Sequence, residues 1–158
     1  MSPSRKPKRP QATHTPSGKK EPRTASGLNP EAFNQKKIAW GFEFLDQGGP
    51  WGLKAMNQDW QVEILPKLRM FESMTWQEIL SASGAKKKGR GNHHHSVAVE
   101  KLSKDAQKRL KEIKLDDVES LFSLRLTGRK RLYGIRDGRV FKFIWYDREH
   151  EVYLSSPN

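Results

Sequence analysis

The sequence predicts an α+β fold: an antiparallel four-stranded sheet in the order β-α-α-β-β-β, with helices packed on one face. A period-two run of apolar residues occurs early in the chain, apolar residues at helical spacing fill the middle, and three further alternating runs follow near the end. Amphipathic helices must bury their apolar sides, so we expect them to cover one side of the sheet. The other side would then be free to meet a ligand.

The first expected strand runs from Lys37 to Leu45. Its large apolar residues alternate with small or polar ones, as in a half-buried strand; the apolar set is Ile38, Trp40, Phe42 and Phe44. The segment from Asp46 to Pro50 contains two glycines and a proline, which favour a turn. We therefore expect the chain to leave the sheet there.

Two helical segments are expected next. Apolar residues at three- and four-residue steps line one helix face between Asp59 and Phe71. Pro66 lies inside this pattern and should kink or break the helix, because proline has no N–H and clashes with the preceding turn. Thr75 and Glu78 match a capping box, which predicts that a short second helix begins there.

A third helix is expected after the middle of the chain. Its apolar residues keep helical spacing while lysines occupy the other faces; the apolar set is Val99, Leu102, Ala106, Leu110 and Ile113. This is the pattern of an amphipathic helix with one buried stripe.

The last third of the chain predicts a three-stranded antiparallel meander. Alternating runs begin at Leu121, at Arg131 and at Val140. The pair Asp137-Gly138 separates the last two runs and suits the positive φ values of a type I′ hairpin turn.

Alternation along the last strand predicts which side chains share a face. Lys142 and Tyr146 should lie together, with Phe141, Phe143 and Trp145 on the opposite face. One face would then be core and the other a surface for phosphates.

Charge and composition divide the chain into parts. Residues 1–28 lack hydrophobic periodicity and carry seven basic residues against one glutamate, which predicts a disordered basic tail. The tail is either an arm that follows phosphates or a solvated leader. Residues 29–158 are expected to form a single domain with a basic, glycine-punctuated loop at 84–95.

The net charge of +12 and the pI near 10.0 point to a polyanionic partner, since neutralising phosphates releases condensed counterions. The chain has no cysteine, and no apolar run approaches the roughly 18 residues of a membrane-spanning helix. We therefore expect a cytoplasmic protein that binds nucleic acid and no membrane.

Candidate catalytic groups gather near the end of the last strand. A metal-free ribonuclease activates a ribose 2′-hydroxyl, surrounds the phosphorane with cations and supplies an acid for the leaving oxygen. His150 and Tyr153 suit that chemistry. The consecutive histidines 93–95 are poor joint ligands for one metal, so we interpret them as solvated loop residues, with proton transfer or an RNA contact as the alternative. No metal site and no cofactor are expected.

The segments from Leu124 to Gly128, from Arg131 to Ile135, from Arg139 to Tyr146 and from Glu151 to Tyr153 resemble the RelE/ParE superfamily of bacterial toxins of type II toxin–antitoxin systems. RelE-like members are metal-independent endoribonucleases that cut mRNA on the ribosome and are neutralised by a cognate antitoxin. The resemblance implies that Arg125 and Arg131 grip the scissile phosphate and that Tyr153 closes the last strand.

The leading hypothesis is a toxin-like endoribonuclease that acts on RNA, with ribosome-bound mRNA as substrate and an antitoxin protein as partner. Its catalytic residues would be Arg125, Arg131, His150 and Tyr153. Further cations and one tyrosine would bind RNA, namely Arg129, Lys130, Arg136, Lys142, Tyr146, Arg148, Lys86, Lys87, Lys88 and Arg90. The alternatives are a non-catalytic nucleic-acid-binding protein of the same fold and a protein that binds a protein partner, as ParE-like toxins bind gyrase.

Overall fold

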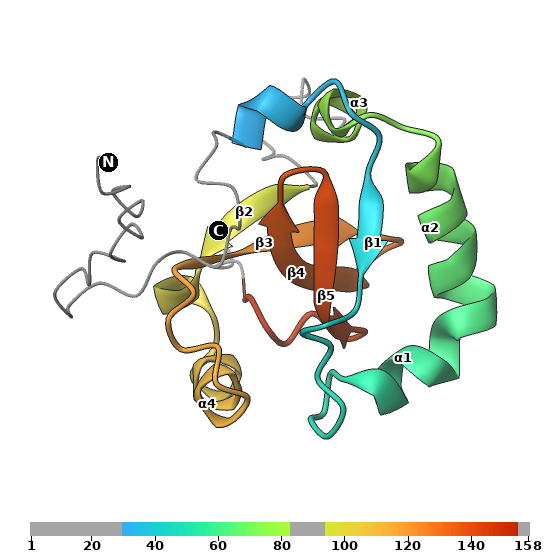
Figure 1. The fold of residues 1–158 in the computed structure, drawn as a ribbon. Coiled ribbons are helices and arrows are strands. Elements are labelled where there is room, and N and C mark those ends of the chain that lie inside the picture. The colour runs from blue at the N-terminus through green and yellow to red at the C-terminus, as the bar shows by residue number, and fades with distance from the viewer. Residues whose placement is uncertain (1–29, 83–93, 155–158) are drawn as a thin grey trace, which may run out of the picture.

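The computed structural model describes residues 30–82 and 94–154, which form a five-stranded sheet with helices around it (Figure 1). The strand order is β1-β5-β4-β3-β2. The bounds are β1 Ala39–Gly41, β2 His95–Ala98, β3 Ser120–Arg125, β4 Arg131–Asp137 and β5 Val140–Asp147. The expected tail and the four loop cations Lys86, Lys87, Lys88 and Arg90 lie outside the described residues.

The α+β class and the C-terminal meander are confirmed, because β3, β4 and β5 pair antiparallel in sequence order. The expectation of four antiparallel strands is wrong in two respects. Strand β1 pairs with β5 in parallel, after which the chain crosses the sheet to reach its other edge. Strand β2 is an additional edge strand; it buries only Val97, so its sequence shows no alternation to detect.

The helical segment expected between Asp59 and Phe71 begins earlier, at Leu53, and no side chain caps its start. Helix α1 (Leu53–Asp59) continues through a π-helical turn (Trp60–Ile64) into α2 (Leu65–Glu72), which has Pro66 in its first turn. Proline is tolerated at that position, because the first helical N–H groups have no partner within the helix. Helix α3 (Trp76–Ser81) begins at the predicted capping box. No helix in the described ranges is long and apolar enough to cross a membrane.

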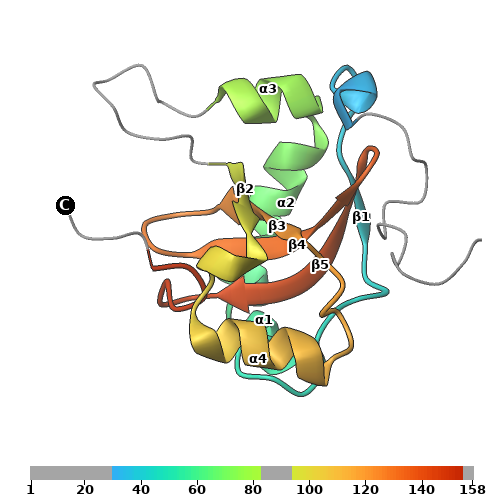
Figure 2. The same ribbon diagram turned by 90° about the vertical axis from the view of Figure 1, so that its left-hand side faces the viewer.

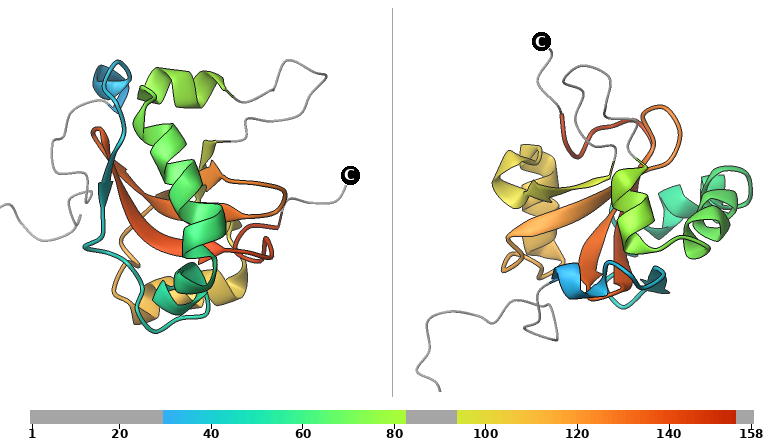
Figure 3. Two further views of the ribbon diagram at one scale, coloured as in Figure 1. Left: turned by 90° about the vertical axis from the view of Figure 1, so that its right-hand side faces the viewer. Right: turned by 90° about the horizontal axis from the view of Figure 1, so that it is seen from above.

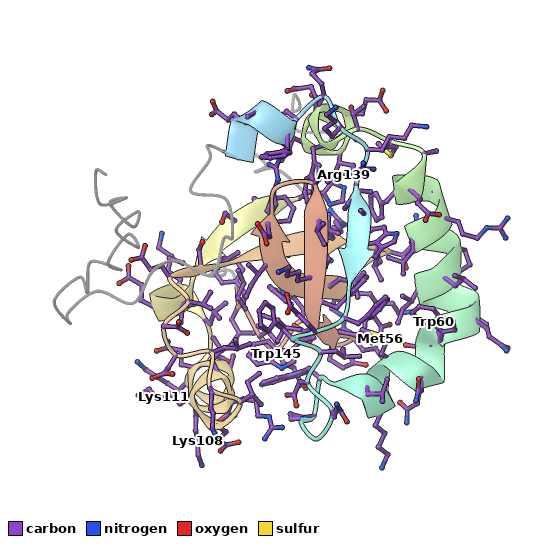
Figure 4. The ribbon with its side chains drawn as sticks, in the orientation of Figure 1. Met56, Trp60, Lys108, Lys111, Arg139 and Trp145 are labelled. Carbon is purple, nitrogen blue, oxygen red and sulfur yellow. The ribbon has the colours of Figure 1, made fainter. Side chains whose placement is uncertain are left out.

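Helix α4 (Lys104–Glu112) is shorter than its apolar pattern suggested. Val99–Lys101 forms a separate 3-10 turn, and the Ser103 side chain then caps α4 by accepting from the Ala106 N–H. Lys108 and Lys111 point from α4 away from the sheet (Figure 4). The lysines therefore lie on the solvent side, as the sequence predicts.

Helices cover both faces of the sheet, so the expectation that one face stays open is wrong. Helices α1 and α2 lie on one side and α4 on the other, as the views from opposite sides show (Figures 2 and 3). Two separate cores result. We call the sheet surfaces the α2 face, which contains Phe141, Phe143 and Tyr146, and the α4 face, which contains Tyr133 and Trp145.

A β-bulge in β5 explains why the predicted face assignment fails. Tyr133 pairs with Trp145 and Gly134 with Phe143, so Ile144 is an extra residue in β5. The alternation shifts at this point. Tyr146 therefore joins the core on the α2 face, while Trp145 packs on the α4 face instead of beside Phe143.

Candidate nucleic-acid site

Two rows of side chains cross the end of the sheet at which β3 and β5 finish. His95, Ser123 and Tyr133 are paired in one row across β2, β3 and β4. The next row contains Arg125, Arg131 and Asp147 on β3, β4 and β5. Residues two apart on a strand share a face, so both rows belong to the α4 face, where Tyr133 is buried. We call these six residues, together with His150 and Tyr153, the α4-face site.

Arg125 and Arg131 form a cross-strand pair of like charges. Such pairs are destabilising unless an anion lies nearby. The Arg131 guanidinium donates to the carbonyl oxygens of Gly128 at 2.7 Å and Lys130 at 3.0 Å. Burial lowers the pKa of Arg131, and the Arg125 charge lowers it further. Neither arginine forms an ion pair with a carboxylate in residues 30–82 or 94–154. The charge of Asp147, the cross-strand neighbour of Arg131 in the same row, raises the pKa of Arg131 and so opposes these two effects.

His150 lies beside these two cations. Its backbone has a φ of 60°, in the left-handed region, which turns the chain sharply after β5. Burial lowers the pKa of His150, and the charge of Arg131 lowers it further, with smaller effects of Arg129 and Arg125 in the same direction. The shift favours the neutral imidazole, which can accept a proton.

Asp147 holds the segment that carries His150. Its fully buried carboxylate accepts hydrogen bonds from the backbone N–H groups of Glu151 at 3.0 Å and Val152 at 2.8 Å. Burial raises the pKa of Asp147, although these two bonds oppose the effect. The segment thereby returns across the α4 face, where Val152 is buried and the Tyr153 ring lies 6.2 Å from the His95 ring.

The structure brings the four predicted catalytic residues to this end of the sheet. The charges of Arg125 and Arg131 act on His150, and Tyr153 lies close enough to affect the pKa of Tyr133. Three residues of the site were not predicted from the sequence, namely Ser123, Tyr133 and Asp147, and His95 was considered for an RNA contact or proton transfer only as the alternative to a solvated loop residue. Only a correct strand register could have identified them, because β2 has no visible alternation and Tyr133 lies inside an apolar run.

Most of the other predicted RNA-binding residues have partners within the protein. Two lie on the α2 face: the Arg136 guanidinium lies 4.1 Å from the centre of the Trp76 ring, and the Tyr146 hydroxyl donates to Asp59 at 2.7 Å. These two residues were wrongly assigned to an open surface, because helices pack over that face and the bulge turned Tyr146 inward.

The remaining cations form ion pairs. Lys142 pairs with Glu43 and Asp137, Lys130 with Glu63, Arg148 with Asp59, and Arg129 with Glu149. The expected open cationic platform is therefore not present. What the structure offers instead is a small site at one end of the α4 face.

His94 and His95 do not lie in a solvated loop as expected. His95 begins β2, and His94 is 7% exposed, packs its ring 5.3 Å from that of Phe71 and accepts a hydrogen bond from the Arg125 backbone N–H through Nδ1. Consecutive strand residues point to opposite faces, so only His95 joins the α4-face site.

The comparisons with known proteins return no match: none of the protein-family models, curated proteins or solved structures that were compared matches this chain. The likeness to RelE/ParE toxins therefore remains a hypothesis from the sequence. Among the described residues, no group of three or more His, Asp and Glu side chains is placed to hold a metal ion.

Proposed function

We propose that the chain is a metal-independent endoribonuclease that acts on RNA. The observation that carries this proposal is the Arg125–Arg131 pair, which forms no ion pair with a carboxylate among the described residues and acts on His150, whose pKa is lowered. A phosphodiester would neutralise the two like charges and place its neighbouring hydroxyl within reach of a base.

The reaction requires stabilisation of the phosphorane, a general base and a general acid, and the site has a group for each role. Arg125 and Arg131 hold the non-bridging oxygens and stabilise the charge of the phosphorane. His150 removes the proton of the ribose 2′-hydroxyl, and the 2′-oxygen then forms a bond to phosphorus. The bond from phosphorus to the 5′-oxygen breaks, and the Tyr153 hydroxyl donates a proton to that oxygen. The products are a 2′,3′-cyclic phosphate and a 5′-hydroxyl.

The test is cleavage of an unstructured, end-labelled oligoribonucleotide in excess EDTA. We expect cleavage with a cyclic phosphate end, and a loss of roughly 10²- to 10⁴-fold in His150→Asn. Asparagine tolerates the left-handed backbone at this position, so this change removes the base and keeps the turn. Tyr153→Phe removes only the hydroxyl and should also slow cleavage.

Arg139→Gln provides the matched control. Arg139 is a surface cation at the other end of the sheet, next to the β4–β5 turn, and its Nε donates to the Lys37 carbonyl (Figure 4). The Arg139→Gln variant should cleave RNA at the rate of the parent chain. Full activity in both His150→Asn and Tyr153→Phe would refute the assignment, and inhibition by EDTA would refute metal independence.

A non-catalytic nucleic-acid-binding protein is the second candidate, favoured by the net charge of +12. This candidate predicts that the chain binds RNA or DNA with an affinity that depends on salt and does not cleave it. A chain that binds a protein partner, as ParE-like toxins do, is expected to show neither salt-sensitive nucleic-acid binding nor cleavage. Co-purification with a small acidic protein that blocks cleavage would support the toxin–antitoxin hypothesis.

A further inference from the structure

An open cavity of about 350 Å³ lies between α2 and the end of β3. Cavities of roughly 300–1,000 Å³ are typical of sites that hold small ligands. We call this cavity the Met70 pocket. Its lining comes from α2, from the segment after α2, from the end of β3 and from the turn that follows; it includes Lys67, Met70, Met74, Arg125, Leu126 and Gly128.

The Met70 pocket adjoins the arginine pair of the α4-face site. Arg125 belongs to both, because it pairs with Arg131 across the strands and also lines the pocket. The Arg131 guanidinium donates to the carbonyl oxygen of Gly128 at 2.7 Å, and Gly128 is a lining residue as well. A phosphate held between the two arginines would therefore lie next to the pocket.

The lining combines positive charge with apolar side chains. Lys67 and Arg125 are cations, and no acidic residue is among the described residues that line the pocket. The cavity beside α4 differs in this respect, because Glu43 and Asp46 line it together with cations. The Met70 pocket therefore suits a ligand that has an apolar surface and carries negative charge close to it.

One wall of the pocket is held in place and another can adapt. His94 and Phe71 line the pocket; their rings meet edge-on at 5.3 Å, and Nδ1 of His94 accepts from the Arg125 backbone N–H at 3.0 Å. Met70 is 46% exposed, and its unbranched thioether side chain can follow the shape of a flat ring. The pocket can thus close around a planar group beside Arg125.

We propose that the Met70 pocket binds one nucleobase of the RNA, on a ribose next to the phosphate that Arg125 and Arg131 hold. A nucleobase has the flat apolar faces that the methionines can cover, and one sugar links it to a phosphate. Proteins recognise single-stranded RNA chiefly through bases that leave the stack and are contacted one at a time. The inference rests on the proposed function, because it takes RNA as the ligand, and it concerns binding and not the chemical step.

The experiment is an NMR titration of the full chain, with isotope-labelled methionine methyl groups, by a dinucleoside monophosphate. This ligand has one phosphate and two bases, and a deoxyribose in its 5′ nucleoside removes the hydroxyl that would attack the phosphate. The methyl signals of Met70 and Met74 should shift, whereas that of Met56, which is buried under α1, should not. Removing one of the two bases should weaken binding about tenfold, and removing the other should have little effect.

Met70→Glu places a carboxylate in the pocket at an exposed position and should remove the effect of the base on affinity. Val62→Glu is the matched control: it makes a similar change on the same helical segment, at a side chain that is 79% exposed and outside the pocket, and should keep that effect.

The inference would be overturned if the signals of Met70 and Met74 did not shift, or if the parent chain bound the ligand equally well with and without either base. A wild-type chain that shows both effects but never cleaves RNA would refute the proposed function and leave this inference standing.

Discussion

Asp46 joins three parts of the molecule through one buried carboxylate. Its oxygens accept from the backbone N–H groups of Gly48 and Gly49, from Nε and Nη2 of Arg109 on α4, and from Nε1 of Trp145 on β5. Burial alone would raise the pKa of Asp46, but the bonds from Arg109, Trp145 and Gly48 outweigh it and lower the pKa to about 2. The charged form therefore stabilises the fold.

We expect Asp46→Asn to lower the free energy of unfolding by about 3 kcal/mol, because Arg109 loses its buried partner. Urea denaturation measures the loss. Glu112→Gln removes the exposed partner of Arg109 and should lower the free energy of unfolding by less than about 1 kcal/mol.

The same network makes stability depend on pH. The pKa of Asp46 is lower in the folded chain than the ordinary 3.8, so its contribution is complete above pH 3.8 and is lost as the pH falls towards 2. Asp46→Asn should flatten this part of the stability curve. An unchanged acid slope in that variant would contradict the assignment.

His150 sets the pH dependence of the proposed cleavage. Its pKa is lowered, so the neutral form that acts as base persists below pH 6.5, and the acid limb of kcat/KM should have its midpoint below that value. Arg131→Gln removes a positive charge and should move the midpoint upward, besides slowing cleavage. A midpoint that does not move would show that another group titrates.

At the scale of elements, the bulge in β5 decides which side chains meet the α2 face. Gly134 lies opposite it, and a Cβ built there would be 2.3 Å from the Lys142 carbonyl oxygen and 2.7 Å from the Phe141 ring. Any larger residue must displace the β5 backbone.

We therefore expect Gly134→Ala to destabilise the protein by about 3 kcal/mol. Gly128→Ala is the comparison. Gly128 has a φ of 55° and nothing within 4 Å of a built Cβ, so only backbone strain of about 1 kcal/mol should result. Thermal unfolding of both variants measures the difference, and equal losses would contradict the steric argument.

Helix α3 depends on its capping box. The Thr75 hydroxyl accepts from the Glu78 N–H, and the Glu78 carboxylate accepts from the Thr75 N–H. Thr75→Ala should lower the free energy of unfolding by about 1 kcal/mol. Thr75→Ser keeps the hydroxyl acceptor, so its free energy of unfolding should stay close to that of the parent chain. Denaturant midpoints compare the two, and a serine variant as weak as the alanine variant would argue against the cap.

At the scale of the whole molecule, the positive charge is concentrated in a few segments. Residues 30–82 and 94–154 contain nineteen basic and seventeen acidic residues, so most of the excess belongs to the tail and to Lys86, Lys87, Lys88 and Arg90. The described part of the chain is therefore nearly neutral, and the arginine pair of the α4-face site is a local concentration of positive charge within it.

Removal of residues 1–28 should weaken RNA binding and make it less sensitive to salt, because the tail contains half of the excess charge. The slope of log affinity against log salt measures the number of phosphates neutralised. Lys108→Gln, an exposed single-charge change on α4, controls for net charge alone. An unchanged slope in the truncated chain would show that the tail does not contact phosphates.

The sequence by itself determined the elements that depend on neighbours in the chain. The capping box at Thr75, the amphipathic stripe of α4 and the hairpin at Gly138 rest on local chemistry, which is readable because a few adjacent residues supply the whole signal. The expected type I′ turn is wrong in detail, because Gly138 has a positive φ and Asp137 does not. Arg125, Arg131, His150 and Tyr153, which the sequence predicts as catalytic residues, lie at one end of the sheet because they occur within one meander and the segment that follows it.

Only the tertiary structure decided the pairing of β1 with β5, the addition of β2 and the cover on both faces of the sheet. These features depend on contacts between residues that are distant in the sequence. The tertiary structure also decided which face the side chains at the end of β5 occupy, because one extra residue in β5 reverses the alternation after it. The strand register also brought His95 beside Tyr153, and no local pattern contains that information, because hydrogen bonds between distant strands set it.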